Sequence, residues 1–162
     1  MKIRTGLGMD IHELTEGRKL VIGGVEILSE KGFKAHSDGD VLVHALCDAL
    51  LGAAGLKDIG SFFPDNDPHW KDVCSLTGIL PKVVEKIRAL GYSISNVDSN
   101  VMIQKPKLAP HIDAIRNNLS GILGIPEEDI SVKAKRTEEC VFMPPREAAL
   151  SLVSVLLVRA DQ

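Results

Sequence analysis

The stretch Ile3-Arg-Thr-Gly-Leu-Gly-Met-Asp-Ile-His12 alternates between apolar residues and polar or glycine residues. A period of two is typical of a β-strand with one apolar face, so we expect a strand over residues 3–12. The two glycines, Asp10 and His12 then share the other face, because side chains two residues apart project from the same side of a strand. Bare backbone at Gly6 and Gly8 would let another group approach closely beside the two polar side chains.

The rest of the chain divides into helical and strand-like segments. A hairpin is expected over residues 19–28, with its turn at Gly23-Gly24. Apolar spacing predicts helices over residues 40–54, 73–90 and 110–123. Further strand-like segments lie over residues 97–104, 130–135 and 147–159. Pro81 predicts that the second helix either kinks there or begins its regular part there. The last segment could be helix or buried strand, and its richness in valine favours a strand.

These segments indicate one α+β domain over residues 1–162, without an internal repeat or linker. We expect a mixed four-stranded sheet with helices packed on one face, a ferredoxin-like arrangement, plus the small β-hairpin.

The composition is ordinary for a soluble globular protein, with 44% hydrophobic and 25% charged residues among 162 and a net charge of −3. Without a basic block, nucleic acid is not an expected partner. Three cysteines without a CxxC pair argue against a disulfide scaffold and for a reducing compartment. We see no signal peptide and no apolar run of the ~20 residues that span a bilayer. We therefore expect a soluble, intracellular protein with no membrane partner.

A possible metal site begins with Asp10 and His12, whose heads can converge on one ion from the same strand face. His44 lies in the first turns of the helix predicted over 40–54. Asp48, one turn further on, has the spacing to hydrogen-bond the second nitrogen of His44. Two imidazoles and one carboxylate suit a catalytic zinc site, because the fourth position stays open for water or substrate. Alternatively, these are ordinary polar side chains on unrelated elements, and spacing alone does not decide.

Several motifs occur in an order that resembles a known family: Gly8-Met-Asp-Ile-His12, Ala35-His-Ser-Asp-Gly-Asp40, Asp58-Ile-Gly60 with Phe63-Pro-Asp-Asn-Asp-Pro68, and Val132-Lys-Ala134 followed by Thr137-Glu138. Almost from end to end, the chain resembles the 2-C-methyl-D-erythritol 2,4-cyclodiphosphate synthase family of the non-mevalonate isoprenoid pathway. The resemblance implies a phosphorus-oxygen lyase that converts 4-diphosphocytidyl-2-C-methyl-D-erythritol 2-phosphate to the cyclic diphosphate and CMP. It also implies a homotrimer with active sites between neighbouring subunits. Its compartment would be a bacterial cytoplasm, or a plastid stroma if a transit peptide was removed.

The resemblance implies a role for each matching residue. Zinc would bind Asp10, His12 and His44, and Glu138 would hold a second divalent ion, Mg²⁺ or Mn²⁺, on the diphosphate. His36, Arg136 and Thr137 would be the catalytic residues and would also contact substrate, as would Asp10 and His12. The other substrate-binding residues would be Ser37, Asp58, Ile59, Gly60, Phe63, Asp65, Asp67, Ile103, Lys107, Ala109, Ala134, Lys135, Phe142 and Pro145.

The chain departs from the family pattern in two places. It has Lys135-Arg136-Thr137-Glu138 where the family often has Thr-Thr-Thr-Glu, so Arg136 takes the place of a threonine. The planar guanidinium of Arg136 could serve a developing phosphate charge, or it could point away and leave that role to Thr137. It also has Phe142-Met-Pro-Pro-Arg-Glu147 where the family often has Phe-x-Gly-Arg-x-Glu. The arginine of this motif, which in the family contacts phosphate or lines a central cavity that can bind isoprenoid diphosphates, is displaced by one position.

Two other functions use the same residues. A metal-dependent phosphohydrolase would need the same ligands, but it would leave the nucleotide and substrate motifs unexplained. A non-catalytic, isoprenoid-binding trimer is supported only by the two departures from the family pattern. Taken singly, His36 could be a solvated loop residue, and Asp58 and Asp65 could be turn formers. The occurrence of all the motifs in order favours the synthase.

Overall fold

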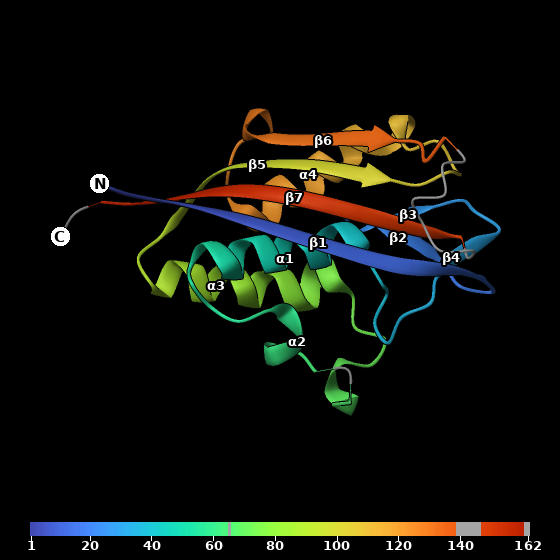
Figure 1. Ribbon diagram of the computed structural model, residues 1–162, viewed down its shortest axis with the longest axis horizontal. Coiled ribbons are helices and arrows are strands. Elements are labelled where there is room, and N and C mark those ends of the chain that lie inside the picture. Colours follow the sequence, from blue (N-terminus) through green and yellow to red (C-terminus); the bar gives the residue numbers. More distant parts are fainter. Residues whose placement is uncertain (65, 139–146, 161–162) are drawn as a thin grey trace.

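The computed structural model describes residues 1–64, 66–138 and 147–160, which contain one mixed sheet and one separate hairpin (Figure 1). The sheet has the strand order β4-β1-β7-β5-β6; β5 and β6 run parallel, and the other neighbours run antiparallel. Its strands are β1 (Lys2–Glu16), β4 (Lys31–Phe33), β5 (Ser93–Met102), β6 (Ile130–Lys135) and β7 (Ala148–Arg159). The hairpin, as predicted, pairs β2 (Leu20–Ile22) with β3 (Val25–Ile27).

The sheet corrects the prediction of four strands, because the described residues form five. β1 continues beyond His12 to Glu16, and its end pairs with β4, where Phe33 lies opposite Leu14. β4 is only three residues long, too short to show an apolar alternation in the sequence. The ambiguous last segment is strand β7, which lies between β1 and β5, so the preference for a strand is confirmed.

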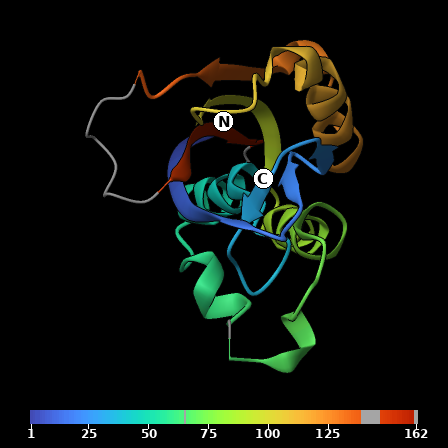
Figure 2. The same cartoon turned by 90° about the vertical axis from the view of Figure 1, so that its right-hand side faces the viewer.

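Helices cover one side of the sheet (Figure 2). They are α1 (Val41–Ala53), α2 (Ile59–Phe62), α3 (Leu80–Ala89) and α4 (Ile112–Leu123), with short turns at Pro68–Trp70, Ser75–Ile79, Ala109–His111 and Glu127–Asp129. α1 lies against β1 and β7, α3 lies against α1, and α4 lies beside β6. The second predicted helix has a π-helical turn over Ser75–Ile79, after which α3 begins with Pro81 in its first turn. Within the described residues, no helix is long and apolar enough to cross a membrane.

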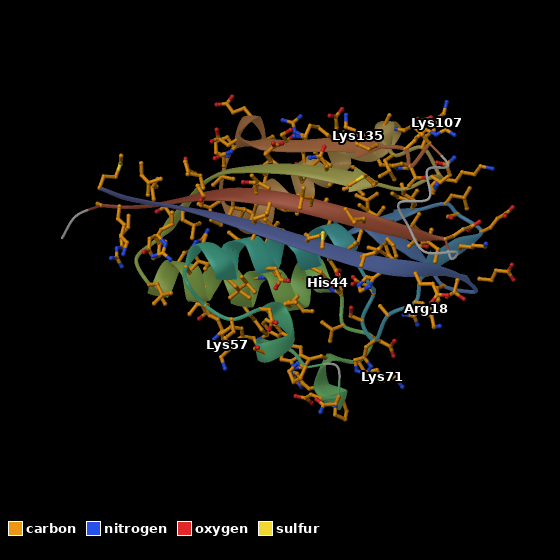
Figure 3. The ribbon with its side chains drawn as sticks, viewed as in Figure 1. Arg18, His44, Lys57, Lys71, Lys107 and Lys135 are labelled. Carbon is orange, nitrogen blue, oxygen red and sulfur yellow. The ribbon has the colours of Figure 1, made fainter. Side chains whose placement is uncertain are left out.

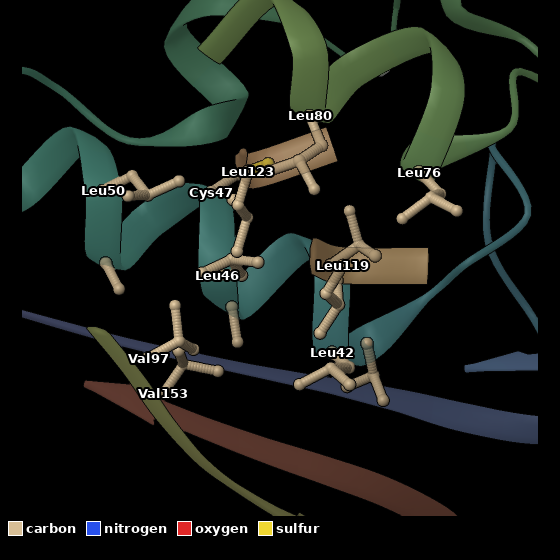
Figure 4. Packing of buried hydrophobic residues seen from close by; sticks show 14 of the residues in the cluster. Leu42, Leu46, Cys47, Leu50, Leu76, Leu80, Val97, Leu119, Leu123 and Val153 are labelled. Atoms are coloured by element: carbon tan, nitrogen blue, oxygen red, sulfur yellow. The ribbon is translucent and has the colours of Figure 1, made fainter. Parts of the chain in front are cut away.

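α1 forms the centre of the hydrophobic core. Leu42, Leu46 and Leu50, its predicted core face, are fully buried. They belong to one cluster with Val153 of β7 and Leu119 of α4 (Figure 4). Burial of a leucine side chain contributes about 1.5–3 kcal/mol. This packing therefore fixes the position of α1 against the sheet.

β1 turns its apolar residues away from the helices. Leu7 and Met9 have exposed fractions of 69% and 60%, whereas Gly8 is buried against α1. A Cβ atom at Gly8 would lie 2.0 Å from the carbonyl oxygen of Ala45, so only glycine lets α1 approach this closely. Gly6 stands in the same relation to α1. The apolar stripe that predicted the strand is therefore the open face of the sheet.

Candidate metal centre and substrate site

Asp10, His12 and His44 converge on one point between β1 and α1 (His44 is labelled in Figure 3). The Oδ2 atom of Asp10 lies 3.2 Å from Nε2 of His12 and 3.1 Å from Nδ1 of His44. The two imidazole nitrogens are themselves 3.1 Å apart. All three side chains are partly shielded from solvent, with exposed fractions between 13% and 24%. The structure thus brings the three predicted ligands together.

The spacing of these atoms fits a small divalent ion. A tetrahedral zinc ion with bonds of about 2.0–2.1 Å holds its ligand atoms about 3.3 Å apart. The separations of 3.1 to 3.2 Å between the three atoms are close to that value. Among the residues that the structure describes, this is the one group of three metal-ligating side chains close enough to share an ion. Three protein ligands leave a fourth position for substrate or water.

Asp10 and His44 shift the pKa values of each other. Burial raises the pKa of Asp10, but the hydrogen bond to His44 and the charges of both imidazoles outweigh it, so the pKa lies below its ordinary value. Burial lowers the pKa of His44, but the hydrogen bond and charge of Asp10 outweigh it, so that pKa is raised. Each of these two side chains therefore favours the charged form of the other.

Asp40 fixes the start of α1 and therefore the position of His44. Its Oδ1 atom accepts hydrogen bonds from the backbone N–H of Val43, at 3.1 Å, and of Gly23, at 2.9 Å. Its Oδ2 atom accepts one from Gly24 at 2.7 Å. Burial raises the pKa of Asp40 to about 6, although these three hydrogen bonds lower it. One carboxyl group thus caps α1 and ties it to the β2–β3 turn.

The second nitrogen of His44 meets Ser75 rather than Asp48. His44 Nε2 lies 2.9 Å from Ser75 Oγ. Asp48 instead accepts a hydrogen bond from the backbone N–H of Ile59 at 2.7 Å, which fixes the start of α2. The predicted hydrogen bond between Asp48 and His44 is therefore wrong. Helical spacing pointed to Asp48, whereas Ser75 is distant in the sequence and belongs to the turn that precedes α3.

A loop with His36 and Ser37 lies next to the metal ligands and is held by Arg18. The guanidinium of Arg18 donates hydrogen bonds to the carbonyl oxygens of Phe33 at 3.2 Å, Ala35 at 3.2 Å and Ser37 at 2.9 Å. No sequence motif had pointed to Arg18. Its position shows that the backbone of this loop is fixed by a residue from the turn between β1 and β2.

The two side chains of this loop face the metal ligands in different ways. Ser37 is buried, and its Oγ atom lies 3.4 Å from Nε2 of His44. The Nε2 atom of His36 is buried and has no hydrogen-bond partner among the described residues. An unpaired buried nitrogen costs about 1–3 kcal/mol, so such atoms are uncommon unless a ligand meets them. This makes His36 Nε2 a position for a hydrogen bond to substrate.

The predicted substrate wall begins at α2. Asp58 caps this helix through the backbone N–H of Ser61, and Ile59 and Gly60 form its first turn. Phe63 is buried behind it, and Asp67 caps the next short turn. Asp58 thus has the turn-forming role that was its alternative interpretation, and Asp67 caps a turn in the same way. The contact of either residue with substrate stays a prediction. Asp65 lies outside the described residues.

The two segments predicted to hold the nucleotide meet at the ends of β5 and β6. The backbone N–H of Ile103 donates to the carbonyl oxygen of Lys135 at 3.0 Å. Thr137 Oγ1 donates to Gln104 Oε1 at 2.7 Å. Lys107 and Lys135 are exposed at this end of the sheet (Figure 3). Cationic side chains therefore stand beside the predicted nucleotide pocket.

The remaining predicted residues lie on the same edge or outside the described part. Ala109, Ala134, Arg136 and Glu138 are exposed, and Phe142 and Pro145 are outside the described residues. β7 and β5 separate β1 from β6, which places the axes of β1 and β6 about 14 Å apart at about 4.8 Å per strand. The structure thus groups the metal ligands, the His36–Ser37 loop and α2, and it leaves the nucleotide segments toward the opposite edge of the sheet, at β5 and β6.

Residues 3–158 match the sequence pattern of the YgbB family. This chain belongs to the YgbB family. It is 50% identical over 157 residues to a 2-C-methyl-D-erythritol 2,4-cyclodiphosphate synthase of Neisseria meningitidis, a match that covers 97% of this chain and 98% of that protein.

Solved structures of similar proteins share the fold of this YgbB protein. The bifunctional IspDF from Campylobacter jejuni is 44% identical with a TM-score of 0.92, over 99% of this chain and 43% of that longer chain. A CDP complex of IspF from Plasmodium falciparum is 36% identical with a TM-score of 0.83, over 98% of this chain and 97% of that one. The arrangement of helices and strands is therefore that of the family.

Proposed function

We propose that this chain converts 4-diphosphocytidyl-2-C-methyl-D-erythritol 2-phosphate to 2-C-methyl-D-erythritol 2,4-cyclodiphosphate and CMP. In this reaction an oxygen of the 2-phosphate attacks the β-phosphorus, and the bond from that phosphorus to the bridging oxygen breaks, so that CMP leaves with the electron pair. The observation that carries the proposal is the Asp10, His12 and His44 group, in a chain whose full-length relatives are named for this synthase. It is a lyase of non-mevalonate isoprenoid biosynthesis, and residues 1–162 act as one domain.

The chemistry explains why such a site needs cations rather than a nucleophilic side chain. Several phosphate oxygens must come together, so the protein has to hold them in line and offset their charge. Asp10, His12 and His44 hold Zn²⁺, and Glu138 holds a second divalent ion, Mg²⁺ or Mn²⁺. Bound ions of this kind would neutralise phosphate charge and orient the reacting groups. The protein itself needs to form no covalent intermediate.

The loop beside the metal ligands binds the phosphate that attacks. His36 Nε2 is buried without a partner among the described residues, which supports a hydrogen bond to a phosphate oxygen. Ser37 offers its hydroxyl on the same side, and Arg18 keeps the backbone of the loop in place. Asp58, with Ile59 and Gly60, contacts the methylerythritol part of the substrate. Phe63, Asp65 and Asp67 form the neighbouring wall.

The nucleotide binds between the ends of β5 and β6. Backbone groups over residues 103–109 and 134–137 hold the cytidine, and the hydrogen bond from Ile103 N–H to Lys135 supports a single pocket made from both segments. Lys107 and Lys135 offset phosphate charge. Thr137 and Arg136 face the transition state, and Phe142 and Pro145 complete the pocket. The relative from Plasmodium falciparum that was solved with CDP supports a nucleotide site in this fold.

Three copies of the chain assemble, with each active site between neighbours. The open face of β1 supports this, because Ile3, Leu7, Met9 and Ile11 are 43% to 69% exposed on one side of one strand. A row of large apolar side chains on one face is typical of a protein interface. The distance between the metal ligands and the nucleotide segments within one chain supports a site completed by a second copy. We expect this assembly in a bacterial cytoplasm, or in a plastid stroma.

One experiment tests the function against its alternatives. The purified protein is incubated with the cytidyl substrate, Zn²⁺ and Mg²⁺, and the phosphorus signals are followed by NMR. Release of CMP together with a cyclic diphosphate supports the synthase. An acyclic phosphate product would point to a phosphohydrolase. Absence of turnover with the metal sites occupied would point to a non-catalytic trimer.

A further inference from the structure

Asp38 lies behind Ser75 and receives donors on both of its carboxylate oxygens. Ser75 Oγ donates to Oδ1 at 2.5 Å, and the backbone N–H of Ser75 donates to Oδ2 at 2.9 Å. The backbone N–H of Asp40 also donates to Oδ1, at 3.2 Å. An ionised carboxylate can only accept, and these three donors suit that state. The single hydroxyl proton of Ser75 is therefore directed at Asp38.

This leaves Ser75 as an acceptor toward His44. A serine hydroxyl has one proton, so an oxygen that donates to Asp38 presents a lone pair to Nε2 of His44, 2.9 Å away. Nε2 then carries the ring proton, and the lone pair of a neutral imidazole is on Nδ1. Nδ1 is the atom that faces Asp10 and His12. Ser75 is fully buried, so water does not compete for this contact.

We propose that Asp38 and Ser75 form a relay that positions His44 for its metal ion, with Ser75 as a positioning residue that selects the metal-binding tautomer. The inference deepens the proposed function, because it rests on the proposed zinc site. Histidine ligands in metalloproteins commonly donate their other ring N–H to a group that fixes tautomer and orientation. Here a serine hydroxyl is interposed between the imidazole and the carboxylate.

The backbone around Ser75 is built in a way that suits this role. Ser75 is the first residue of the π-helical turn Ser75–Ile79, and such turns often mark functional sites. The chain just before it is tied to the His36 loop, since Asp72 N–H donates to the carbonyl oxygen of His36 at 3.0 Å. Asp38 N–H donates to the carbonyl oxygen of Val73 at 3.3 Å. The relay therefore joins two loops that both border the metal ligands.

The test measures zinc affinity without turnover. Ser75→Ala removes the hydroxyl and keeps the backbone N–H bond to Asp38. Competition with a chromophoric chelator should show a 10–100-fold weaker Kd for Zn²⁺, the usual effect of losing an orienting partner. Ser99→Ala is the matched control, because Ser99 is also fully buried and its hydroxyl donates one hydrogen bond, to the carbonyl oxygen of Ser131 at 2.8 Å. Its zinc affinity should stay within twofold of the wild type, since it lies on β5.

A second variant tests the direction of the relay. Asp38→Asn keeps the shape of the side chain but replaces one of its two acceptor oxygens with an amide NH₂ group, which donates. In one orientation this group faces the N–H of Ser75, and in the other it faces the Ser75 hydroxyl and the N–H of Asp40. The serine proton can then turn toward His44 Nε2, which favours the wrong tautomer. Zinc affinity should fall at least as far as in Ser75→Ala. With Co²⁺ in place of Zn²⁺, the visible absorption band should shift or weaken, because it reports the coordination geometry directly. Ser75→Thr, which retains the hydroxyl, should bind Zn²⁺ more tightly than Ser75→Ala does.

The outcomes separate this inference from the proposed function. Wild-type zinc affinity in Ser75→Ala, or equal losses in Ser75→Ala and Ser99→Ala, would overturn the relay even if cyclisation is observed. A selective loss of zinc affinity in a protein that does not cyclise the substrate would support the relay and reject the synthase. A wild-type chain that binds no zinc would overturn the relay together with the metal site.

Discussion

The two faces of the sheet differ in character along β1. Toward α1, the strand presents glycines and then Asp10 and His12, with α1 close enough to add His44. Away from α1, it presents Leu7 and Met9, which are largely exposed. The covered face carries the candidate metal centre, and the open face is where other copies of the chain are proposed to bind.

This difference shows why the buried face of a strand cannot always be recognised from its apolar residues. Large apolar residues usually mark the buried side of a strand. Here the buried side carries Gly6 and Gly8, because α1 approaches the backbone of β1 itself. Close approach of the helix is also what brings His44 to Asp10. The glycines therefore belong to the metal site as much as to the packing.

The largest expected effect is that of His44→Ala on the covered face. Without the third ligand, zinc binding and turnover should both be lost, with activity at least ~1,000-fold lower, or ~4 kcal/mol in transition-state stabilisation. The proposed trimer should persist, since His44 is on the far side of the sheet from the open face. Steady-state assays, metal analysis and light scattering check the three parts. His111→Ala is the control, and retained activity in His44→Ala would reject the ligand assignment.

Gly8→Val should have the next largest effect, on the fold itself. The added Cβ would lie 2.0 Å from the carbonyl oxygen of Ala45, which is backbone and cannot rotate away. α1 would have to shift, at a cost of about 3 kcal/mol or more in the free energy of unfolding. Denaturant unfolding measures this. Gly52→Ala is the control, because a Cβ there meets nothing within 4 Å, and its stability should not fall. Equal stability of Gly8→Val and wild type would contradict the close approach.

Leu7→Glu changes the open face and leaves the covered face as it is. A charge buried between subunits would be costly, so the proposed trimer should dissociate while each chain keeps its fold. Light scattering should give the mass of one chain, and circular dichroism should be unchanged. Activity should fall with the assembly, because the proposed site lies between subunits. Leu28→Glu serves as the control, since Leu28 is 96% exposed and lies outside the sheet. A stable trimer in Leu7→Glu would place the interface elsewhere.

Local patterns predicted much of this architecture. The alternation over residues 3–12, the leucines of α1 and the glycine turn of the hairpin each carried enough information in a short window to define an element. β4 was missed because a three-residue strand is defined by its partner, not by its own sequence. The three candidate metal ligands could be predicted for a similar reason. Asp10 and His12 are two residues apart on one strand, and His44 follows a specific motif.

The supporting residues of the site could not be predicted in this way. Asp48 was chosen by helical spacing, but the turn before α3 brings Ser75 closer to His44. Arg18 holds the loop with Ser37 across a distance in sequence that no pattern spans. Such contacts depend on how loops fold over the helices, so only the assembled structure reveals them.

The smallest expected effect is a pH dependence of the metal-free protein that belongs to the covered face alone. The pKa of His44 is raised above 6.5 in the folded state, so its contribution to stability is fully present below pH 6.5 and is lost as the pH rises through the folded pKa. The pKa of Asp10 is lowered from 3.8, so its contribution is present above pH 3.8 and is lost as the pH falls through the folded value. The pair therefore stabilises the metal-free fold most between these two pH values.

Unfolding temperatures of wild type and His44→Gln, measured in a chelator at several pH values, test this. The wild type should have its greatest advantage near pH 5.5 and should lose most of it in alkaline solution. Zinc should reverse the trend, because it competes with the proton for His44 and so adds more stability as the pH rises. Leu7→Glu should leave both trends unchanged within the single chain, because the open face does not touch this pair. A constant gap between wild type and His44→Gln at every pH would show that Asp10 and His44 do not interact as charges.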